Sequence, residues 1–280
     1  MPSFRQQKTS PAGESALTLR TADGAPLYTF PGSVVTSMRH METMLLYNDT
    51  LPARISVVAA LRQEGVTYTT LALATTLAYD LAARICVVDL NWWSPGLRTQ
   101  PDPNADATSS DNGKNKAGRS KKRRNKSTPD QASAEATGQM AISPADMTGL
   151  AAVLSRSLSL DEALVPTGLP NLALLPAGPI TPAQRPALAR SDGLKTCIEQ
   201  LGRRFDHVLL DIPAILATSD AIALASLGTA CCLVIRQGVT PMTNVRCALD
   251  DVKHLPMLGV VLNQTQSHLP RWVRALVPQE

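Results

Sequence analysis

The sequence predicts an α/β protein, with a mostly parallel sheet and helices on both faces. Short apolar runs rich in Val, Ile and Leu alternate with segments whose apolar residues recur at helical spacing, which implies parallel strands joined by right-handed crossovers. Two of the apolar runs end on an aspartate, Asp89 and Asp211, at the strand end where open sheets place their ligands. Of the 280 residues, 44% are apolar and only 4% are aromatic, which suits a core rich in Ala, Leu and Val.

The sequence has no feature of a membrane span or of a secretory signal. No apolar run reaches the roughly 18 residues that a span requires, and the first residues, MPSFRQQKTSPAGES, are polar. We therefore expect a cytoplasmic protein.

Residues 1–32 are predicted to be an N-terminal arm. Within it, LTLR and PLYTF flank Asp23-Gly24, which favours a tight turn between two short strands; a loosely attached arm is the alternative. Residues 33–48 carry an apolar stripe at helical spacing that Ser33 is placed to cap. This helix would pack on the edge of the sheet or form a subunit contact.

Residues 33–99 are predicted to hold the first part of the α/β domain, built around a strand, turn, helix and strand. A short apolar strand at 55–60 leads through a polar turn containing Gly65 to a helix at 67–83. A second buried strand at 84–89 ends on Asp89.

The turn between this first strand and its helix is a candidate phosphate site. Backbone N–H groups at the start of a helix lie unpaired at the positive end of its dipole, where phosphates bind. The phosphate-loop pattern GxxxxGK[ST] adds a lysine for the β and γ phosphates and a hydroxyl for magnesium. Here residues 60–67 read ALRQEGVT, so Gly65 and Thr67 remain whereas Ala60 and Val66 replace the first glycine and the lysine.

Two adjacent tryptophans, Trp92 and Trp93, follow the second strand. They would contact a ligand at this end of the sheet, or cover a subunit or linker contact. Residues 100–145 are predicted to be a basic disordered insert, because Ser, Asn, Asp, Lys and Pro dominate there and cannot supply a core.

The positive charge of the chain is concentrated in this insert. Residues 101–130 contain eight Lys/Arg and four Asp/Glu, which leaves 19 of each from totals of 27 and 23, so the net charge of +4 lies in the insert. The run at 114–126 could attract an anionic membrane or nucleic acid. Simple solvation of a long linker is the alternative.

Residues 146–280 are predicted to complete the same α/β domain. Asp211 ends one of its strands and Asn263 another. Together with the Gly65 loop and Asp89, these residues should gather at the carboxyl edge of the sheet. The expected helices are 147–155, 158–164, 194–204, 221–227 and 241–254, and the expected strands are 171–177, 205–211, 230–236 and 258–263.

Several spaced motifs resemble those of the cytoplasmic tyrosine kinases of bacterial capsule and exopolysaccharide synthesis, in the MinD/ParA-like branch of P-loop ATPases. The similarity covers roughly residues 33–263 without the insert. Its motifs are SLDEAL at 159–164, GLPNLALLPAGP at 168–179, FDHVLLDIP at 205–213, SDAIALA at 219–225 and LGVVLN at 258–263.

The resemblance implies ATP and Mg²⁺ as cofactors and assigns roles to individual residues. Asp211 falls on the Walker B aspartate, and Asp89 falls on the first aspartate of a DxD motif that polarises the tyrosine hydroxyl; the second has become Asn91. Thr67, Asp89 and Asp211 would hold the metal, and Asp89 and Asp211 would be catalytic. The implied nucleotide-contacting residues are Arg62, Glu64, Gly65, Val66, Thr67, Tyr68 and Asn263.

Three departures from the family pattern bear on activity. Val66 replaces the phosphate lysine, and Arg62 would either substitute for it or stay in solvent. The E-x-x-R-x-x-R pattern that assembles rings reads Thr36, Arg39 and Glu42. The tyrosine cluster that ends family members is absent, since the tyrosines here are Tyr28, Tyr47, Tyr68 and Tyr79.

The leading hypothesis is a degenerate member of this family, a pseudoenzyme. It would be a regulatory or scaffolding partner of a membrane chain-length or co-polymerase protein of polysaccharide export, peripheral to the inner face of the membrane, with self-association left open. An active tyrosine autokinase or ATPase is the first alternative. The second is a MinD/ParA-like positioning protein that binds membrane or nucleic acid through 114–126 or through 271–274.

Overall fold

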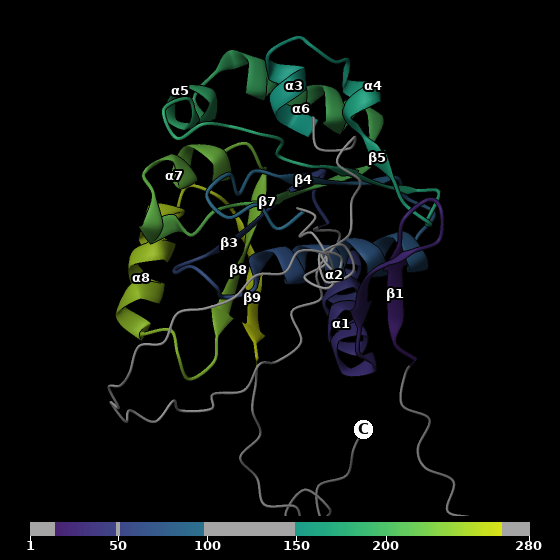
Figure 1. Ribbon diagram of the computed structural model, residues 1–280. Coiled ribbons are helices and arrows are strands. Elements are labelled where there is room, and N and C mark those ends of the chain that lie inside the picture. The colour runs from purple at the N-terminus through teal and green to yellow at the C-terminus, as the bar shows by residue number, and fades with distance from the viewer. Residues whose placement is uncertain (1–14, 49–50, 98–148, 265–280) are drawn as a thin grey trace, which may run out of the picture.

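The computed structural model describes residues 15–48, 51–97 and 149–264. Within these residues the main sheet has seven strands in the order β5-β6-β4-β7-β3-β8-β9, all parallel to their neighbours except β5 (Figure 1). The predicted α/β class with a mostly parallel sheet is confirmed. The strands are β3 (Arg54–Ala59), β4 (Ile85–Asp89), β5 (Val165–Pro166), β6 (Leu172–Leu175), β7 (His207–Asp211), β8 (Ala230–Arg236) and β9 (Met257–Asn263).

Helices cover both faces of this sheet, because successive residues of its central strands point to opposite sides. Ile55 and Val57 of β3 belong to one buried cluster with the N-terminal hairpin, α1 (Gly32–Tyr47) and α2 (Val66–Asp80), whereas Val58 belongs to a second cluster on the other face. That second face carries α3 (Gly149–Leu154), α4 (Leu160–Ala163), α5 (Arg185–Ala189), α6 (Asp192–Arg204), η3 (Ile215–Ala217), α7 (Asp220–Ala225) and α8 (Met242–Asp251).

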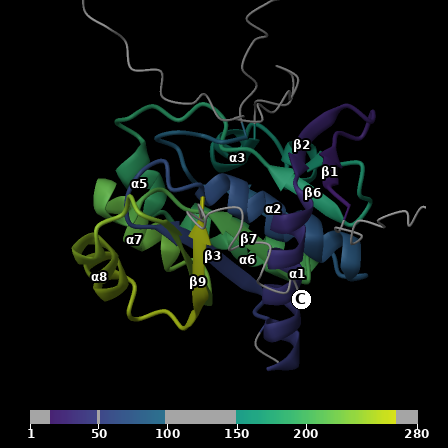
Figure 2. The same cartoon turned by 90° about the horizontal axis from the view of Figure 1, so that it is seen from below.

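The N-terminal strand pair is confirmed as an antiparallel hairpin of β1 (Leu17–Arg20) and β2 (Pro26–Phe30). Leu19, Leu27 and Phe30 are buried in the α2-side cluster, so the hairpin packs on the domain. Both views place it beside α1 and α2 (Figures 1 and 2).

The α1 helix packs against α2 through Val35 and Met38. The prediction that Ser33 caps it is wrong, because the helix already begins at Gly32 and Pro31 occupies the cap position without a side-chain hydrogen bond. A proline is tolerated there because the helical hydrogen-bond pattern does not use the N–H of a cap residue.

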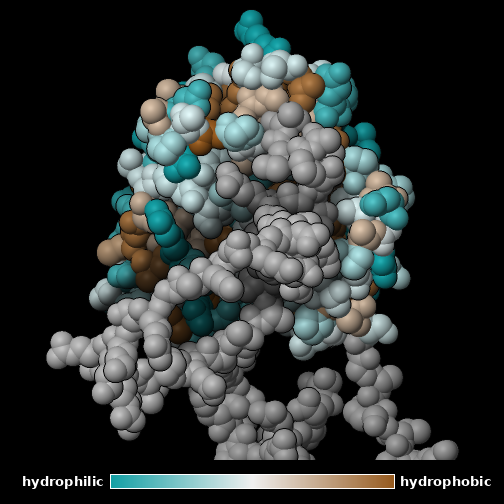
Figure 3. All heavy atoms as spheres, in the orientation of Figure 1, coloured by the Kyte–Doolittle hydropathy of each residue, from teal (hydrophilic) through white to brown (hydrophobic). Residues whose placement is uncertain are grey.

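Three short elements, β5, α5 and η3, were not predicted from the sequence; β5 and α5 contain a proline, and η3 begins two residues after Pro213. Apolar side chains on the face shown in Figure 3 form small groups among polar ones, including one over α7 and α8. No helix among the described residues has the length and apolar character needed to cross a membrane.

Candidate functional site

The candidate phosphate loop joins β3 to α2. Two of its residues have left-handed backbones, Gln63 with φ +63 and Gly65 with φ +91. Gly65 precedes the first residue of α2, and a Cβ at this position would collide with the side-chain amide of Asn263. The loop therefore requires glycine at 65 for both its backbone conformation and its close contact with β9.

Thr67, Asp89 and Asp211 lie together at the carboxyl edge of the sheet, as predicted. Asp89 and Asp211 are register partners in β4 and β7, and both are 0% exposed. Thr67, in the first turn of α2, donates a hydrogen bond from Oγ1 to Asp211 Oδ2 over 2.6 Å. The other oxygen of Asp211 is buried and has no hydrogen-bond partner among the described residues.

The backbone of the following segment orients the carboxylate of Asp89. Its two oxygens accept hydrogen bonds from the N–H groups of Asn91, at 2.9 Å, and Leu97, at 3.2 Å. The segment closes over Thr67, because a Cβ on Gly96 would collide with the Thr67 side chain. Gly96 was not predicted, because its contact follows from this chain path and not from a local motif.

The paired carboxylates produce an unfavourable negative environment. Burial, and then the charge of Asp89, raise the pKa of Asp211 well above its usual range, while the hydrogen bond from Thr67 opposes the rise. A divalent cation bound at the two carboxylates would offset the repulsion between them.

The donors present fit Mg²⁺, which prefers oxygen ligands. They are the hydroxyl of Thr67 and the carboxylates of Asp211 and Asp89, with one Asp211 oxygen unpartnered among the described residues. Because Mg²⁺ keeps several waters and is usually held by one or two carboxylates plus substrate phosphates, this set is sufficient.

The lysine position differs in chemistry from an ordinary phosphate loop. Val66 begins α2 and packs against the α2-side cluster, so an apolar side chain replaces a cation. Arg62, the predicted substitute, is exposed.

Glu64 and Asn263 hold the loop in place. Glu64 is only 3% exposed; its Oε2 accepts from the N–H of Leu61 over 3.0 Å, and its Oε1 accepts from the hydroxyl of Thr240. The side-chain amide of Asn263 donates to the carbonyl of Glu64 over 2.9 Å. Thr240 was missed, since nothing local links it to a residue 176 positions away.

Tyr68 lines a pocket between α1, α2 and β9. Its ring also meets Phe30 edge-on, with centroids 5.3 Å apart, and Tyr28 at 6.3 Å. Burial, followed by the charges of Asp211, Tyr68 and Asp89, raises the pKa of Tyr28. Tyr28 was not among the predicted site residues. The pocket has a volume of about 170 Å³ and is lined by Ser33, Val34, Ser37, Met38, Tyr68, Thr69, Ala72, Val261, Leu262, Asn263 and Gln264.

The tryptophan pair makes a contact within the chain. Trp92 is 2% exposed, its ring stacks on Trp93 with centroids 6.1 Å apart, and the guanidinium of Arg185 lies 5.3 Å from the centre of the Trp93 ring. The pair therefore joins the segment over Thr67 to the start of α5.

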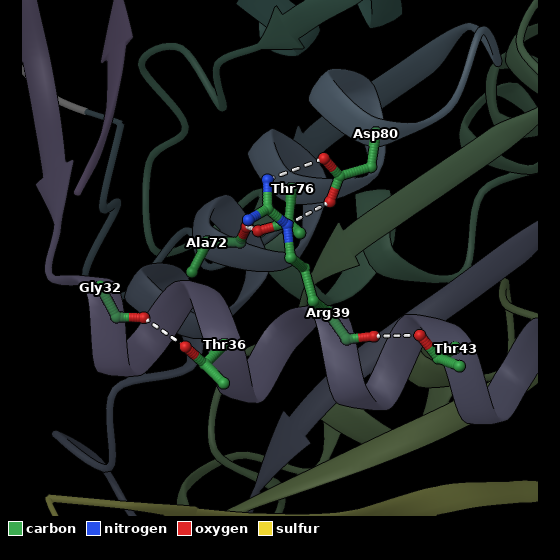
Figure 4. A network of polar contacts seen from close by, with 7 residues as sticks. All are labelled: Gly32, Thr36, Arg39, Thr43, Ala72, Thr76 and Asp80. Carbon is green, nitrogen blue, oxygen red and sulfur yellow. Dashed lines mark hydrogen bonds and ion pairs between the residues drawn. The ribbon is translucent and has the colours of Figure 1, made fainter. Parts of the chain in front are cut away.

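The residues at the ring-assembly positions of α1 are engaged locally. Thr36 donates to the carbonyl of Gly32 over 2.9 Å, and Arg39 forms a two-pronged ion pair with Asp80 of α2, at 2.7 and 2.9 Å (Figure 4). Glu42 is 5% exposed. Arg39 thus joins two helices of one chain.

The residues on which the membrane and nucleic-acid hypotheses depend, 114–126 and 271–274, lie outside the described residues. The same is true of the insert at 100–145 and of residues 1–14 of the arm, so the predicted domain boundaries stay predictions.

Comparison with known proteins found sequence relatives among bacterial tyrosine-protein kinases. The chain is 28% identical over 120 residues to the tyrosine-protein kinase ptk of Acinetobacter johnsonii, covering 42% of this chain and 16% of that protein. It is 33% identical over 133 residues to the succinoglycan biosynthesis transport protein ExoP of Rhizobium meliloti, covering 44% and 16%, and 31% identical over 120 residues to the tyrosine-protein kinase CpsD of Streptococcus pneumoniae, covering 42% and 52%. The matches thus span at most about half the length of these relatives, and no family model matches.

Solved structures show the same fold. The VpsO kinase domain superposes with a TM-score of 0.61 at 18% identity, covering 84% of this chain and 95% of that one. The kinase domain of Escherichia coli ETK gives 0.59 at 16%, covering 84% and 79%, and the cell division ATPase MinD of Pyrococcus furiosus gives 0.50 at 20%, covering 81% of each. The chain is therefore a relative of the bacterial tyrosine-protein kinases, with the fold of their kinase domains and of MinD-like P-loop ATPases.

Proposed function

We propose that this chain is a kinase-like protein that binds Mg-ATP but has lost efficient phosphoryl transfer. One observation carries the proposal: Thr67, Asp89 and Asp211 lie together at the edge of the sheet as metal-binding oxygens would, whereas the partly buried, apolar Val66 stands where a phosphate loop has lysine. Metal binding and phosphoryl transfer depend on different residues, so the chain can keep the first while losing the second.

With Val66 at the lysine position, the transferring phosphate lacks the positive charge that a lysine would supply. Phosphoryl transfer relies on positioning and on neutralising charge, and removing a comparable stabilising group slows catalysis roughly 10²- to 10³-fold. Ground-state binding still has the N-terminus of α2, a 15-residue helix, and a metal held by the carboxylates. Weak nucleotide binding with little turnover is the expected result.

We further propose a regulatory or scaffolding role in exopolysaccharide or capsule synthesis and export. The support is the similarity to tyrosine-protein kinases and to a succinoglycan biosynthesis transport protein. The partner would be a membrane chain-length or co-polymerase protein, and the chain would act at the inner face of the membrane.

Calorimetry with Mg-ATP and a phosphotyrosine assay on the purified chain test the biochemical part. We expect magnesium-dependent binding that Asp211→Asn abolishes, because this change replaces a buried carboxylate by an uncharged amide of nearly the same shape. Phosphotyrosine should stay at background. Robust autophosphorylation of the wild-type chain would contradict the loss of transfer, and absence of Mg-ATP binding would contradict the nucleotide site.

An active autokinase or ATPase is the second candidate, and the buried Asp89–Asp211 pair favours it. Asp89 would accept the proton of the attacking hydroxyl or water. In that case Asp89→Asn should abolish turnover while the exposed Asp192→Asn, on α6, leaves it unchanged. Turnover that persists in Asp89→Asn would rule out this assignment.

A further inference from the structure

Arg236 ends β8 at the same edge of the sheet as the phosphate loop. Val234, two residues earlier, is the register partner of Ala59 at the end of β3, and Arg236 itself is the partner of Asn263 in β9. Side chains alternate along a strand, and Cys232 and Val234 both lie in the α2-side cluster. Arg236 therefore projects toward the face that carries α2 and the loop.

Hydrogen bonds fix the backbone of Arg236 to the loop. Its N–H donates to the hydroxyl of Thr240 over 3.2 Å, and that hydroxyl donates to the buried carboxylate of Glu64. From the other side, Asn263 contacts Gly65 and donates to the carbonyl of Glu64. Two separate connections thus hold Arg236 beside the residues that would surround a phosphate.

The site needs a cation that the lysine position does not provide. Val66 is apolar, and the buried carboxylates of Glu64, Asp89 and Asp211 surround the loop, so a polyphosphate would meet excess negative charge. Arg236 is half-buried, and its guanidinium forms no ion pair or hydrogen bond within the described part of the chain. It is available, and its planar donors match phosphate oxygens.

We infer that Arg236 is a phosphate-binding residue, which provides to the nucleotide the positive charge missing at position 66. This inference rests on the proposed nucleotide binding and adds the group that makes it feasible. It also disfavours Arg62, which lies exposed on the loop itself, whereas a strand end and two backbone connections position Arg236.

The experiment measures Mg-ATP, Mg-ADP and adenosine binding by calorimetry for the wild-type chain, Arg236→Gln, Arg236→Lys and Arg62→Gln. Losing a hydrogen-bonded charged contact should weaken Mg-ATP binding by about 10- to 100-fold in Arg236→Gln. Adenosine binding should be unchanged, since it has no phosphate, and Arg236→Lys should retain part of the affinity. Arg62→Gln tests the competing assignment, and we expect it to stay within about 2-fold because an exposed charge contributes little. Arg203→Gln, exposed on α6, is the matched control and should leave binding unchanged.

A restored lysine gives a second, independent readout. If Arg236 and a lysine at position 66 serve the same phosphates, Val66→Lys should recover most of the affinity lost in Arg236→Gln, so the two effects are not additive. Wild-type binding that is unaffected in Arg236→Gln, or that is lost instead in Arg62→Gln, would overturn the inference and leave the proposed function standing. Absence of Mg-ATP binding by the wild-type chain and by Val66→Lys would overturn both.

Discussion

Glu42 should make the stability of this protein depend on pH, and Glu42→Gln should remove that dependence. Glu42 lies on α1 against α2, is 5% exposed, and has one carboxylate oxygen without a hydrogen-bond partner among the described residues. Burial and the neighbouring charge of Asp80 raise the pKa of Glu42 from 4.5 to about 7, while Arg39 opposes the rise. The folded state therefore binds a proton more tightly than the unfolded chain.

The sign and size of the effect follow from this difference. Stability from a protonated Glu42 is fully present below pH 4.5, falls as the pH rises, and is lost above about pH 7. A rise from 4.5 to about 7, at about 1.36 kcal/mol per pKa unit, corresponds to at most about 3 kcal/mol. Gln has the same shape and no charge, so Glu42→Gln should be more stable than the wild type at pH 8 and nearly equal to it at pH 5.

Urea unfolding of the two proteins at pH 5, 6, 7 and 8 gives the free-energy difference at each pH. Taking the difference cancels the titration of other groups, Asp211 included. Glu199→Gln, on the exposed side of α6, is the control and should show no such trend. A free-energy difference between Glu42→Gln and wild type that stays constant from pH 5 to 8 would refute the reasoning.

Three other substitutions test the loop, a helix cap and the carboxylate pair. Gly65→Ala should lower the free energy of unfolding by at least about 1–3 kcal/mol, because Gly65 has φ +91 and a Cβ would collide with Asn263; an unchanged urea midpoint would contradict the loop geometry. Ser159→Ala should cost about 1 kcal/mol, because its hydroxyl accepts the N–H of the third residue of α4 in a capping box; thermal melting checks this, and an unchanged melting temperature would count against it. Asp211→Asn should stabilise the protein in metal-free buffer near pH 7, because it removes one of two adjacent buried carboxylates; a lower unfolding midpoint would show that the Thr67 hydrogen bond outweighs the repulsion.

Part of the site could be predicted because it depends on short segments. Asp89 and Asp211 each end an apolar run, and the carboxyl ends of parallel strands meet at one edge of a sheet. The structure brings them into register. Gly65 and Thr67 were predicted from a loop pattern whose spacing is fixed by the start of a helix.

The remaining contacts depend on packing between distant parts of the chain. Thr240 reaches Glu64 across 176 positions of sequence, and Tyr28 comes from the N-terminal hairpin. No local pattern encodes which hydroxyl meets which carboxylate, because this depends on strand order. The Ser33 cap was wrong for a different reason: the helix begins at Gly32, directly after Pro31, two residues earlier than a cap at Ser33 requires.

The attachment of Glu64 to Thr240 and of Asn263 to the loop backbone has a kinetic consequence. A loop that its own protein already holds in shape does not have to be ordered by an arriving ligand, so association needs little rearrangement. Its rate should then follow long-range electrostatic attraction and fall with added salt. The same rigidity would let a chain without the usual lysine keep the shape of a nucleotide-binding loop. Losing one charge would then weaken nucleotide affinity without changing the structure of the loop.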